Sequence, residues 1–369
     1  MSEPNIGNER IKRRYFHYLR EAEGRSPKTV EHARHALVRY ERFTECKDFK
    51  RFKSADAIRF RKSLLDHDGK RAVQLSSRAT IHTVLTQLRK FFRWLAGQPG
   101  FKKSIGYAEA DYFSLSARDR KIALERRERP CPTLEQIGKV IGVMPGETDV
   151  ELRNRALVAC AALTGARVSA LATLKLKHVR PDRQGINQDA AEVETKFAKT
   201  FPTFFFPVGE DIRDLFLDYV DHLQSKRLFG GDDPLFPSSK QDVGAAHMFE
   251  TTGLRRVHWM TADPVRRIFK EAFARAGLPY YSPHSFRRTL ARLGEQVCST
   301  PEAFKAWSQN LGHEEVLTTF TSYGAVAPIR QAELMSALNP RQAVAEYDLA
   351  AALRNALPPE VLRALQGAQ

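Results

Sequence analysis

Residues 118–129 form a run dominated by charged side chains, which limits how the chain can be divided into folded domains. Such a run contributes little to an apolar core, and Pro130 and Pro132 follow it, which disfavours a regular element there. With 369 residues, the chain is also longer than one typical domain requires. We therefore predict an N-terminal domain at 1–105, a basic linker at 106–132, a second domain at 133–340 and a C-terminal helical tail at 341–369.

The first domain has the sequence pattern of a helical bundle. Ser26 can cap a helix whose first position is Pro27, and apolar residues then recur every three or four positions. The clearest apolar stripe lies within 81–95, with arginine and lysine outside it, and Gly97 ends that helix. With a shorter helix near 55–65, the pattern predicts about four short helices over residues ~10–100.

The second domain mixes helices with a small sheet. Thr133 and Gln136 fit a capping box that opens a helix. Aromatic residues concentrated in 192–208 favour two or three antiparallel strands. Helical spacing is expected in six segments, namely 149–162, 167–176, 212–224, 264–276, 284–296 and 301–311. The fold class is therefore mainly α with a small antiparallel β-sheet.

Positive charge is concentrated in the first third of the chain. The net charge is +16, and the first 129 residues hold 31 basic and 16 acidic side chains, against 28 and 27 in the remainder. Charged side chains are usually just a solvated surface. Their uneven distribution here favours a polyanionic partner, since a basic surface binds a phosphate backbone by releasing counterions. We expect double-stranded DNA rather than an anionic membrane, because no lipidation signal or long amphipathic basic helix is present.

Several other classes of protein are disfavoured by what the sequence lacks. It has no uncharged apolar run of membrane-spanning length, and its start lacks the apolar stretch of a secretory signal. The four cysteines lie far apart, without C-x-x-C spacing, which argues against a zinc site or a disulfide scaffold. We expect a cytoplasmic, nucleoid-associated protein with reduced cysteines.

Two segments of the second domain place arginines at predicted helix starts. In 163–169, a turn of small residues delivers Arg167. In 282–288, a proline sets the helix start, so His284 and Arg287 share one helical face. The N–H groups and the dipole at a helix N-terminus favour anions, so this second pattern is typical of a phosphate site. Either segment alone is also found on ordinary protein surfaces.

Two more segments carry residues that could take part in chemistry. Leu-Gly-His at 311–313 is followed by Tyr323, although a half-buried aromatic is the commoner role for a tyrosine. Lys196 lies in the presumed sheet, where a hairpin lysine that faces solvent is the ordinary alternative.

The order of these residues is more specific than any one of them. The candidate residues follow one another in the order Arg, Lys, His-x-x-Arg, Leu-Gly-His and Tyr. This order, in a basic chain, closely resembles the tyrosine recombinase (phage integrase) family. Arg-Ser-Pro-Lys-Thr at 25–29 and Leu-x-x-Leu-Arg-Lys-Phe-Phe at 85–92 add to the resemblance, which covers roughly residues 10–340. It implies a two-domain DNA clamp, with a helical core-binding bundle and an α+β catalytic domain.

The resemblance also implies a role for each candidate residue. Two arginines would clamp the scissile phosphate, a tyrosine would attack it and form a 3′-phosphotyrosine link, and a lysine would protonate the leaving 5′ oxygen. No cofactor or metal is then expected, and partners would be duplex DNA and other copies of the chain in a DNA-bound multimer, a tetramer. Carried over by position, the catalytic set is Arg167, Lys196, His284, Arg287, His313 and Tyr323.

The sequence departs from the family pattern at several positions. Ala170 stands where an acidic residue is usual, and Arg288 stands where many relatives carry histidine. Thr195 and Phe197 replace the glycines that usually flank the lysine, and a long preceding loop leaves Lys199 as a rival to Lys196. Two other functions stay open at this point, a type IB topoisomerase and a non-catalytic DNA-binding protein on the same scaffold.

Overall fold

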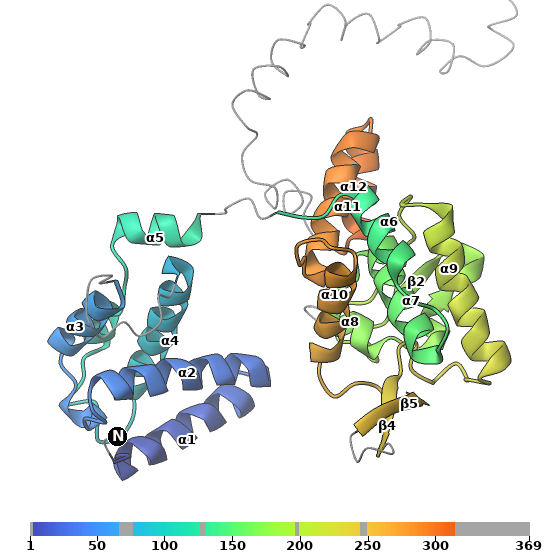
Figure 1. Ribbon diagram of the computed structural model, residues 1–369. Helices are drawn as coiled ribbons and strands as arrows, with labels where there is room; N and C mark the ends of the chain where they lie inside the picture. The colour runs from blue at the N-terminus through green and yellow to red at the C-terminus, as the bar shows by residue number, and fades with distance from the viewer. Residues whose placement is uncertain (1–2, 66–76, 126–129, 196–198, 244–248, 314–369) are drawn as a thin grey trace, which may run out of the picture. The chain divides into compact units, whose positions relative to one another are not determined.

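The chain forms two compact units, Met1–Arg126 and Arg127–Gln369, each with its own hydrophobic core (Figure 1). The computed structural model describes residues 3–65, 77–125, 130–195, 199–243 and 249–313. Among these, no helix is long and apolar enough to cross a membrane. All four cysteines lie among the described residues, and none of them forms a disulfide there.

The first unit is the predicted bundle of helices. The side chain of Ser26 accepts a hydrogen bond from the backbone N–H of Thr29, and Gly97 caps the C-terminus of α4, which confirms both expected helix ends. Short 3-10 turns occur at Phe49–Arg51 and Tyr107–Tyr112. The helices are α1 (Ile6–Glu21), α2 (Pro27–Phe43), α3 (Ser54–Leu65), α4 (Arg78–Ala96) and α5 (Ala117–Leu124).

Aromatic side chains make up much of the first unit's core. Phe91 and Phe92 of α4 are fully buried, and Phe92 contacts the rings of Tyr40, Phe52 and Phe113. Half of the ring pairs in the first unit lie edge to face, an arrangement that the ring quadrupole favours. One large aromatic cluster thus joins α2, α4 and the segments between α2 and α5.

The charged run expected as a linker begins with a helix. Residues Ala117–Leu124 form α5, which Ser116 caps and in which no residue is buried. An ion pair between Arg78 and Asp119 ties α5 to the start of α4. Because α5 has no buried residue, it lies outside the core, as expected for a linker. Its charged side chains are nevertheless compatible with a capped helix on the surface.

The second unit carries the remaining helices around a central one. Thr133 and Gln136 form the predicted capping box at the start of α6. The elements are α6 (Leu134–Val143), α7 (Asp149–Thr164), α8 (Val168–Thr173), β1 (Val179–Arg180), β2 (Gly185–Gln188), β3 (Phe201–Phe204), α9 (Glu210–Asp221) with a π-helical end (His222–Lys226), β4 (Ser238–Val243), β5 (Phe249–Arg255), α10 (Asp263–Arg275), α11 (Pro283–Val297) and α12 (Pro301–Asn310).

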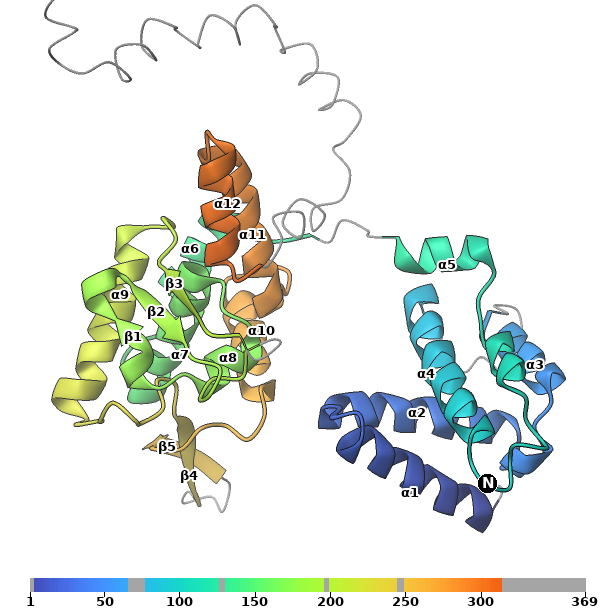
Figure 2. The same cartoon turned by 180° about the vertical axis from the view of Figure 1, so that it is seen from behind.

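Helix α7 is the centre of this core. Every residue from Ala156 to Thr164 is buried, on all sides of the helix rather than on one face. The chain around it includes α6, α9 and α11, which all contact α7 (Figure 2). A helix without a polar face must be enclosed, so α7 fixes the positions of its neighbours.

Two details of the second unit differ from expectation. The helix after Arg167 ends at Thr173 rather than near 176, because the chain turns there into a short 3-10 segment, Leu176–His178. The three-stranded antiparallel sheet, in the order β1-β2-β3, begins at Val179 and not within 192–208, where only β3 lies. These strands are two to four residues long, too short for an alternating pattern to emerge.

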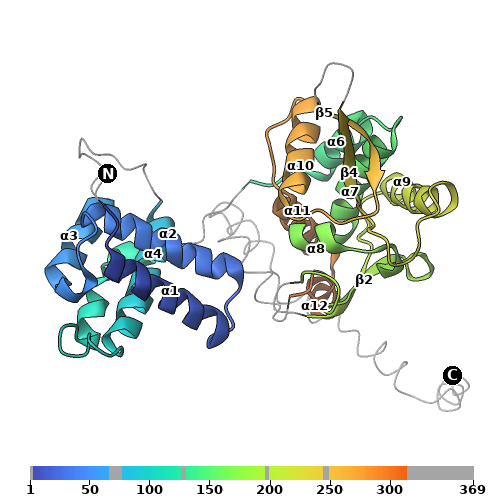
Figure 3. The same cartoon turned by 90° about the horizontal axis from the view of Figure 1, so that it is seen from below.

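A second sheet has no counterpart in the sequence-based expectation. Strands β4 and β5 pair antiparallel and form a ribbon at the end of the unit opposite α12, seen nearest the viewer in Figure 3. Buried Arg153 of α7 holds the base of this ribbon, since its Nη1 donates to Pro237 O at 2.8 Å and its guanidinium stacks on Trp259.

Candidate active site

Arg167 stands at the turn between α7 and α8, where it is the N-cap residue of α8. Helix α7 ends at Gly165, whose left-handed φ of 57° is unfavourable for other residues. The hydroxyl of Thr164 donates to Cys160 O at 2.6 Å and accepts from Ala166 N at 3.1 Å. The turn of small residues noted in the sequence therefore has a fixed shape.

Space as well as backbone conformation requires glycine at position 165. A Cβ atom there would lie 2.9 Å from Leu290 Cδ1, 3.1 Å from Leu311 Cδ2 and 3.3 Å from Arg287 Cγ. These three side chains come from α11 and from the segment after α12. The end of α7 is consequently packed directly against the two other predicted motifs.

Arg287 connects these motifs through hydrogen bonds. Its side chain is buried, with the residue 5% exposed. Nη1 donates to Gly165 O at 2.6 Å, and Nη2 donates to Leu311 O at 2.5 Å. Nη2 also lies 3.1 Å from His313 Nε2. One guanidinium thus joins the turn that leads to Arg167 with the Leu-Gly-His segment.

The bond to Arg287 also defines the protonation of His313 in this arrangement. A guanidinium only donates, so His313 Nε2 accepts and the ring proton lies on Nδ1. His284 is one helical turn before Arg287, at the exposed start of α11. The Ser282 side chain forms no cap at this helix start. Polar N–H groups and a histidine are therefore presented together at the N-terminus of α11.

Among the residues that the structure describes, none is an acidic partner of Arg167. Burial alone lowers the pKa of its half-buried guanidinium. Within the described ranges, no hydrogen bond or ion pair of this guanidinium is found. A cation that is partly desolvated without a counter-ion would gain from binding an anion, and guanidinium geometry suits a phosphate.

The sheet and α12 hold each other in place. Asn310 Oδ1 accepts from Phe204 N at 2.7 Å, and its Nδ2 donates to Phe204 O at 2.9 Å. The Thr203 hydroxyl donates to Asn310 O at 3.3 Å. A Cβ at Gly312 would lie 2.4 Å from Phe201 Cζ. The start of the Leu-Gly-His segment is therefore fixed against β3.

The structure brings together Arg287 and His313, bonds Arg287 to Gly165, two residues before Arg167, and places His284 on the helix that carries Arg287. Lys196 and Tyr323 lie outside the described residues. Lys199 is described and half-buried, just before β3, and Ala170 is buried within α8. Asn310 was missed by sequence reasoning, since nothing in its local sequence signals a contact with a strand about a hundred residues away.

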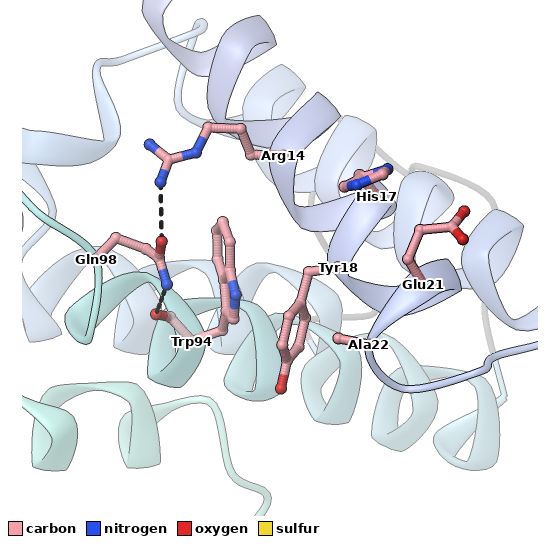
Figure 4. A pocket seen from close by; sticks show the side chains of 7 residues that line it. All are labelled: Arg14, His17, Tyr18, Glu21, Ala22, Trp94 and Gln98. Atoms are coloured by element: carbon pink, nitrogen blue, oxygen red, sulfur yellow. Dashed lines mark hydrogen bonds between the residues drawn. The ribbon is translucent and has the colours of Figure 1, made fainter.

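The first unit contains a separate hollow of about 640 Å³ between α1 and α4 (Figure 4). Within it, Arg14 Nη2 donates to Gln98 Oε1 at 3.1 Å, and Gln98 Nε2 donates to Trp94 O at 3.3 Å. None of the predicted catalytic residues lines it, so it is not the candidate active site. The lining residues are Arg14, His17, Tyr18, Glu21, Ala22, Trp94 and Gln98.

Comparison with known proteins gives matches in both units. The model of the phage integrase family matches residues 133–329, and that of the phage integrase N-terminal SAM-like domain matches 13–98. Tyrosine recombinase XerC of Lactobacillus delbrueckii subsp. bulgaricus is 26% identical over 245 residues, which cover 65% of this chain and 70% of that protein.

Solved structures show the same fold at low sequence identity. A lambda integrase tetramer bound to a Holliday junction is 16% identical, with a TM-score of 0.56 over 84% of this chain and 78% of that one. The Tn1549 transposon integrase in complex with transposon right-end DNA is 15% identical, with a TM-score of 0.55 over 88% and 98%.

The family model at 133–329 spans every predicted catalytic position, from Arg167 to Tyr323. A second model accounts for most of the helical bundle. These matches confirm the resemblance and the two-part fold expected from the sequence. The chain belongs to the phage integrase family and is a tyrosine recombinase.

Proposed function

We propose that this chain is a site-specific recombinase that cleaves and rejoins duplex DNA through a 3′-phosphotyrosine link to Tyr323. The observation that carries the proposal is the set of bonds made by Arg287, which links the Arg167 turn to the Leu-Gly-His segment. Residues far apart in the sequence converge there, in the order that the family motif requires.

The two arginines would act on the scissile phosphate. Charge develops on the non-bridging oxygens during phosphoryl transfer, and preorganised guanidinium groups stabilise it without further rearrangement. Arg167 is half-buried without an acidic partner in the described ranges, and Arg287 is held rigidly by two carbonyl oxygens. His284 and His313 would bind the same phosphate from the start of α11 and the end of α12.

Two proton transfers would be needed, one from the attacking tyrosine and one to the leaving oxygen. Tyr323 has to lose a proton, and with an ordinary tyrosine pKa of about 10 it needs cationic neighbours and an acceptor. The leaving 5′ oxygen has to gain one, and Lys196 is the proposed general acid. The phosphotyrosine link conserves the energy of the broken phosphodiester, so rejoining requires no metal or nucleotide.

DNA binding and assembly would involve both units. The basic surplus in the first 129 residues supports binding to the phosphate backbone. The lambda integrase relatives are a dimer bound to a core site and a tetramer bound to a Holliday junction, which supports a DNA-bound tetramer here. Action at the nucleoid, in the cytoplasm, follows from such a substrate.

The tail at 341–369 would take part in this assembly. Leu349, Leu353 and Leu357 have helical spacing and lie outside the described residues. An apolar stripe on a helix needs a surface to cover it, and we propose a neighbouring copy rather than the same domain. Docking of this kind would couple the placement of Tyr323 to occupancy of the neighbouring site.

Replacement of the proposed nucleophile tests the function. Tyr323→Phe should abolish the SDS-stable adduct with DNA that carries the target site, while DNA affinity stays nearly unchanged. Tyr280→Phe, at an exposed tyrosine of the same unit, is the matched control and should form the adduct normally. An adduct formed by Tyr323→Phe would show that another residue attacks. Relaxation of supercoiled DNA without any special site would instead favour a topoisomerase.

A further inference from the structure

The Leu-Gly-His segment ends helix α12 in a defined turn. Gly312 has a left-handed φ of 69°, and its backbone N–H donates to Gln309 O at 2.7 Å. The backbone N–H of His313 donates to Ser308 O at 3.2 Å. These two bonds form a Schellman motif, whose left-handed position favours glycine. The backbone of His313 is therefore set by the end of α12, so the position of that helix end decides where the histidine lies.

Helix α12 is held against α11 by its tryptophan. Trp307 Nε1 donates to Leu290 O at 2.9 Å. A Cβ at Gly294 would lie 2.6 Å from the same nitrogen, so the indole and the α11 backbone are in close contact. This attachment holds α12 on α11, and it leaves the position of α12 relative to the sheet to other contacts.

Asn310 attaches the end of α12 to strand β3, and the two elements are in contact (Figure 2). It is the last residue of the helix, and its side-chain amide bonds to both backbone groups of Phe204. Oδ1 accepts from Phe204 N at 2.7 Å, and Nδ2 donates to Phe204 O at 2.9 Å. Because β3 is an edge strand, one side chain takes the place of a neighbouring strand there. Two bonds from one planar amide fix direction as well as distance.

Strand β3 is also bonded to the end of α7. Phe206 N donates to Leu163 O at 2.7 Å, two residues before Gly165. Arg287 then joins the ends of α7 and α12, since Nη1 donates to Gly165 O and Nη2 lies 3.1 Å from His313 Nε2. Strand β3, the end of α7, the arginine and the end of α12 thus form a closed ring of hydrogen bonds. The amide at the end of α12 is the link that returns this ring to the strand.

We infer that Asn310 is a positioning residue that holds His313 Nε2 within hydrogen-bond reach of Arg287. The inference rests on the proposed role of His313 at the scissile phosphate. A shift of the helix end by ~1 Å would lengthen the 3.1 Å contact beyond the range of a hydrogen bond. Misplacement of that size costs roughly a hundredfold in rate. Asn310 bonds to neither side chain, so it acts only through the place that it gives to the histidine.

The tautomer of His313 reports its bond to Arg287 in the absence of DNA. Which ring nitrogen carries the proton is set by the hydrogen bond that the other makes. Nitrogen NMR of the histidine-labelled full-length chain, with His313→Gln to assign the signals, should show the Nδ1–H form in the wild type. Asn310→Ala should lose this preference. The variant should still fold, because alanine favours a helix and water can reach the backbone of exposed Phe204.

Cleavage rates test whether Asn310 acts through His313. In single-turnover assays at saturating protein, Asn310→Ala should cleave target DNA roughly ten- to a hundredfold more slowly. In a chain that already carries His313→Ala, the same replacement should slow cleavage less than about twofold, because the residue that it positions is gone. A role in stability alone would give the same loss in both backgrounds.

Two further variants make the test specific. Asn187 lies half-buried on β2, and within the described ranges no hydrogen bond of its side chain is found. Asn187→Ala should change neither the tautomer nor the cleavage rate. Asn310→Asp keeps the shape of the side chain, but a carboxylate cannot donate to Phe204 O. It should lose the Nδ1–H preference as well, and it gives the same readout if Asn310→Ala does not fold.

An unchanged tautomer in Asn310→Ala and Asn310→Asp would overturn the inference, whatever reaction the protein performs. Equal slowing with and without His313 would overturn it too, since the defect would then lie elsewhere. Wild-type cleavage by a variant with an altered tautomer would show that the bond to Arg287 is not needed. Absence of a DNA adduct with the wild-type chain would refute the proposed function, while the tautomer would still report whether Asn310 places His313.

Discussion

The two units of this protein use positive charge in opposite ways. In the first unit, many basic side chains lie on the outside of a bundle whose core is aromatic. In the second unit, basic and acidic residues nearly balance, yet individual arginines are buried and bonded to backbone carbonyl oxygens. In the first unit, the number of basic side chains should determine DNA affinity, because each phosphate contact releases counterions and these contributions add up. In the second unit, the exact position of each arginine should determine the cleavage rate, because one displaced guanidinium disrupts the site.

The largest effect is expected at the most precisely held cation. Arg287→Lys should reduce cleavage by at least about a hundredfold, because an ammonium group cannot span the carbonyls of Gly165 and Leu311 in the geometry of a planar fork. Leaving buried carbonyls without a donor should also cost about 1–3 kcal/mol of unfolding free energy. Single-turnover cleavage and urea unfolding measure the two effects.

Arg266→Lys is the matched control for that substitution. Arg266 lies on the surface of α10 and forms an ion pair with Asp263, three residues before it on the same helix. Its replacement should change stability by less than about 0.5 kcal/mol and leave cleavage unaffected. Unchanged cleavage in both variants would mean that the second unit responds to charge alone, as the first is expected to do, because lysine keeps the positive charge. Equal losses in both variants would mean that the position of Arg287 has no special role.

The next largest effect concerns the contribution of the many basic side chains of the first unit to DNA affinity. A fragment of residues 1–129 should bind duplex DNA without the second unit, and its affinity should fall at least about a hundredfold between ~50 and ~200 mM salt. Fluorescence anisotropy over a salt series gives the slope, which reports how many phosphates are neutralised. A fragment with salt-independent binding, or with none, would contradict the assignment of affinity to this unit.

A smaller effect is expected where backbone shape positions the second unit's arginines. Gly165→Ala should lose about 2–4 kcal/mol of unfolding free energy, since a left-handed backbone and contacts with Leu290 and Leu311 both oppose a Cβ. Gly277→Ala has a similar φ of 67° but no atom within 4 Å of the added Cβ, so it should lose only about 1–2 kcal/mol. Thermal unfolding measures the stability of both variants. Equal losses of unfolding free energy would show that the contacts of position 165 with Leu290 and Leu311 do not oppose a Cβ there.

The smallest effect on DNA binding is expected from the tail. Deletion of residues 341–369 should leave affinity for a single site unchanged and slow recombination between paired sites severalfold, because the proposed docking joins neighbouring copies. Gel-shift and recombination assays on the same DNA measure both quantities. Recombination at the full-length rate would assign the tail a structural role within its own unit.

The sequence was most informative where one face of an element is apolar and the other is polar. Helix α4 and the caps at Ser26 and Thr133 follow directly from such local patterns. The order of Arg167, Arg287 and Tyr323 then identified the family, because several motifs in sequence are far more specific than one.

Other features depend on contacts that no local pattern encodes. Strand β2 has four residues, of which three are buried, so no alternation marks it. Helix α8 ends early, at Thr173, whose hydroxyl bonds to the loop that passes beside it. The bridge from Arg287 to Gly165 spans more than a hundred residues and is visible only in three dimensions.

Identification of the residue that becomes linked to DNA decides whether Tyr323 is the nucleophile. The full-length protein is incubated with DNA that traps the cleaved state, the adduct is digested with protease, and the nucleotide-bearing peptide is sequenced by mass spectrometry. We expect a single modified residue, Tyr323, joined to a 3′ phosphate. Attachment at any other residue, or at a 5′ phosphate, would contradict it.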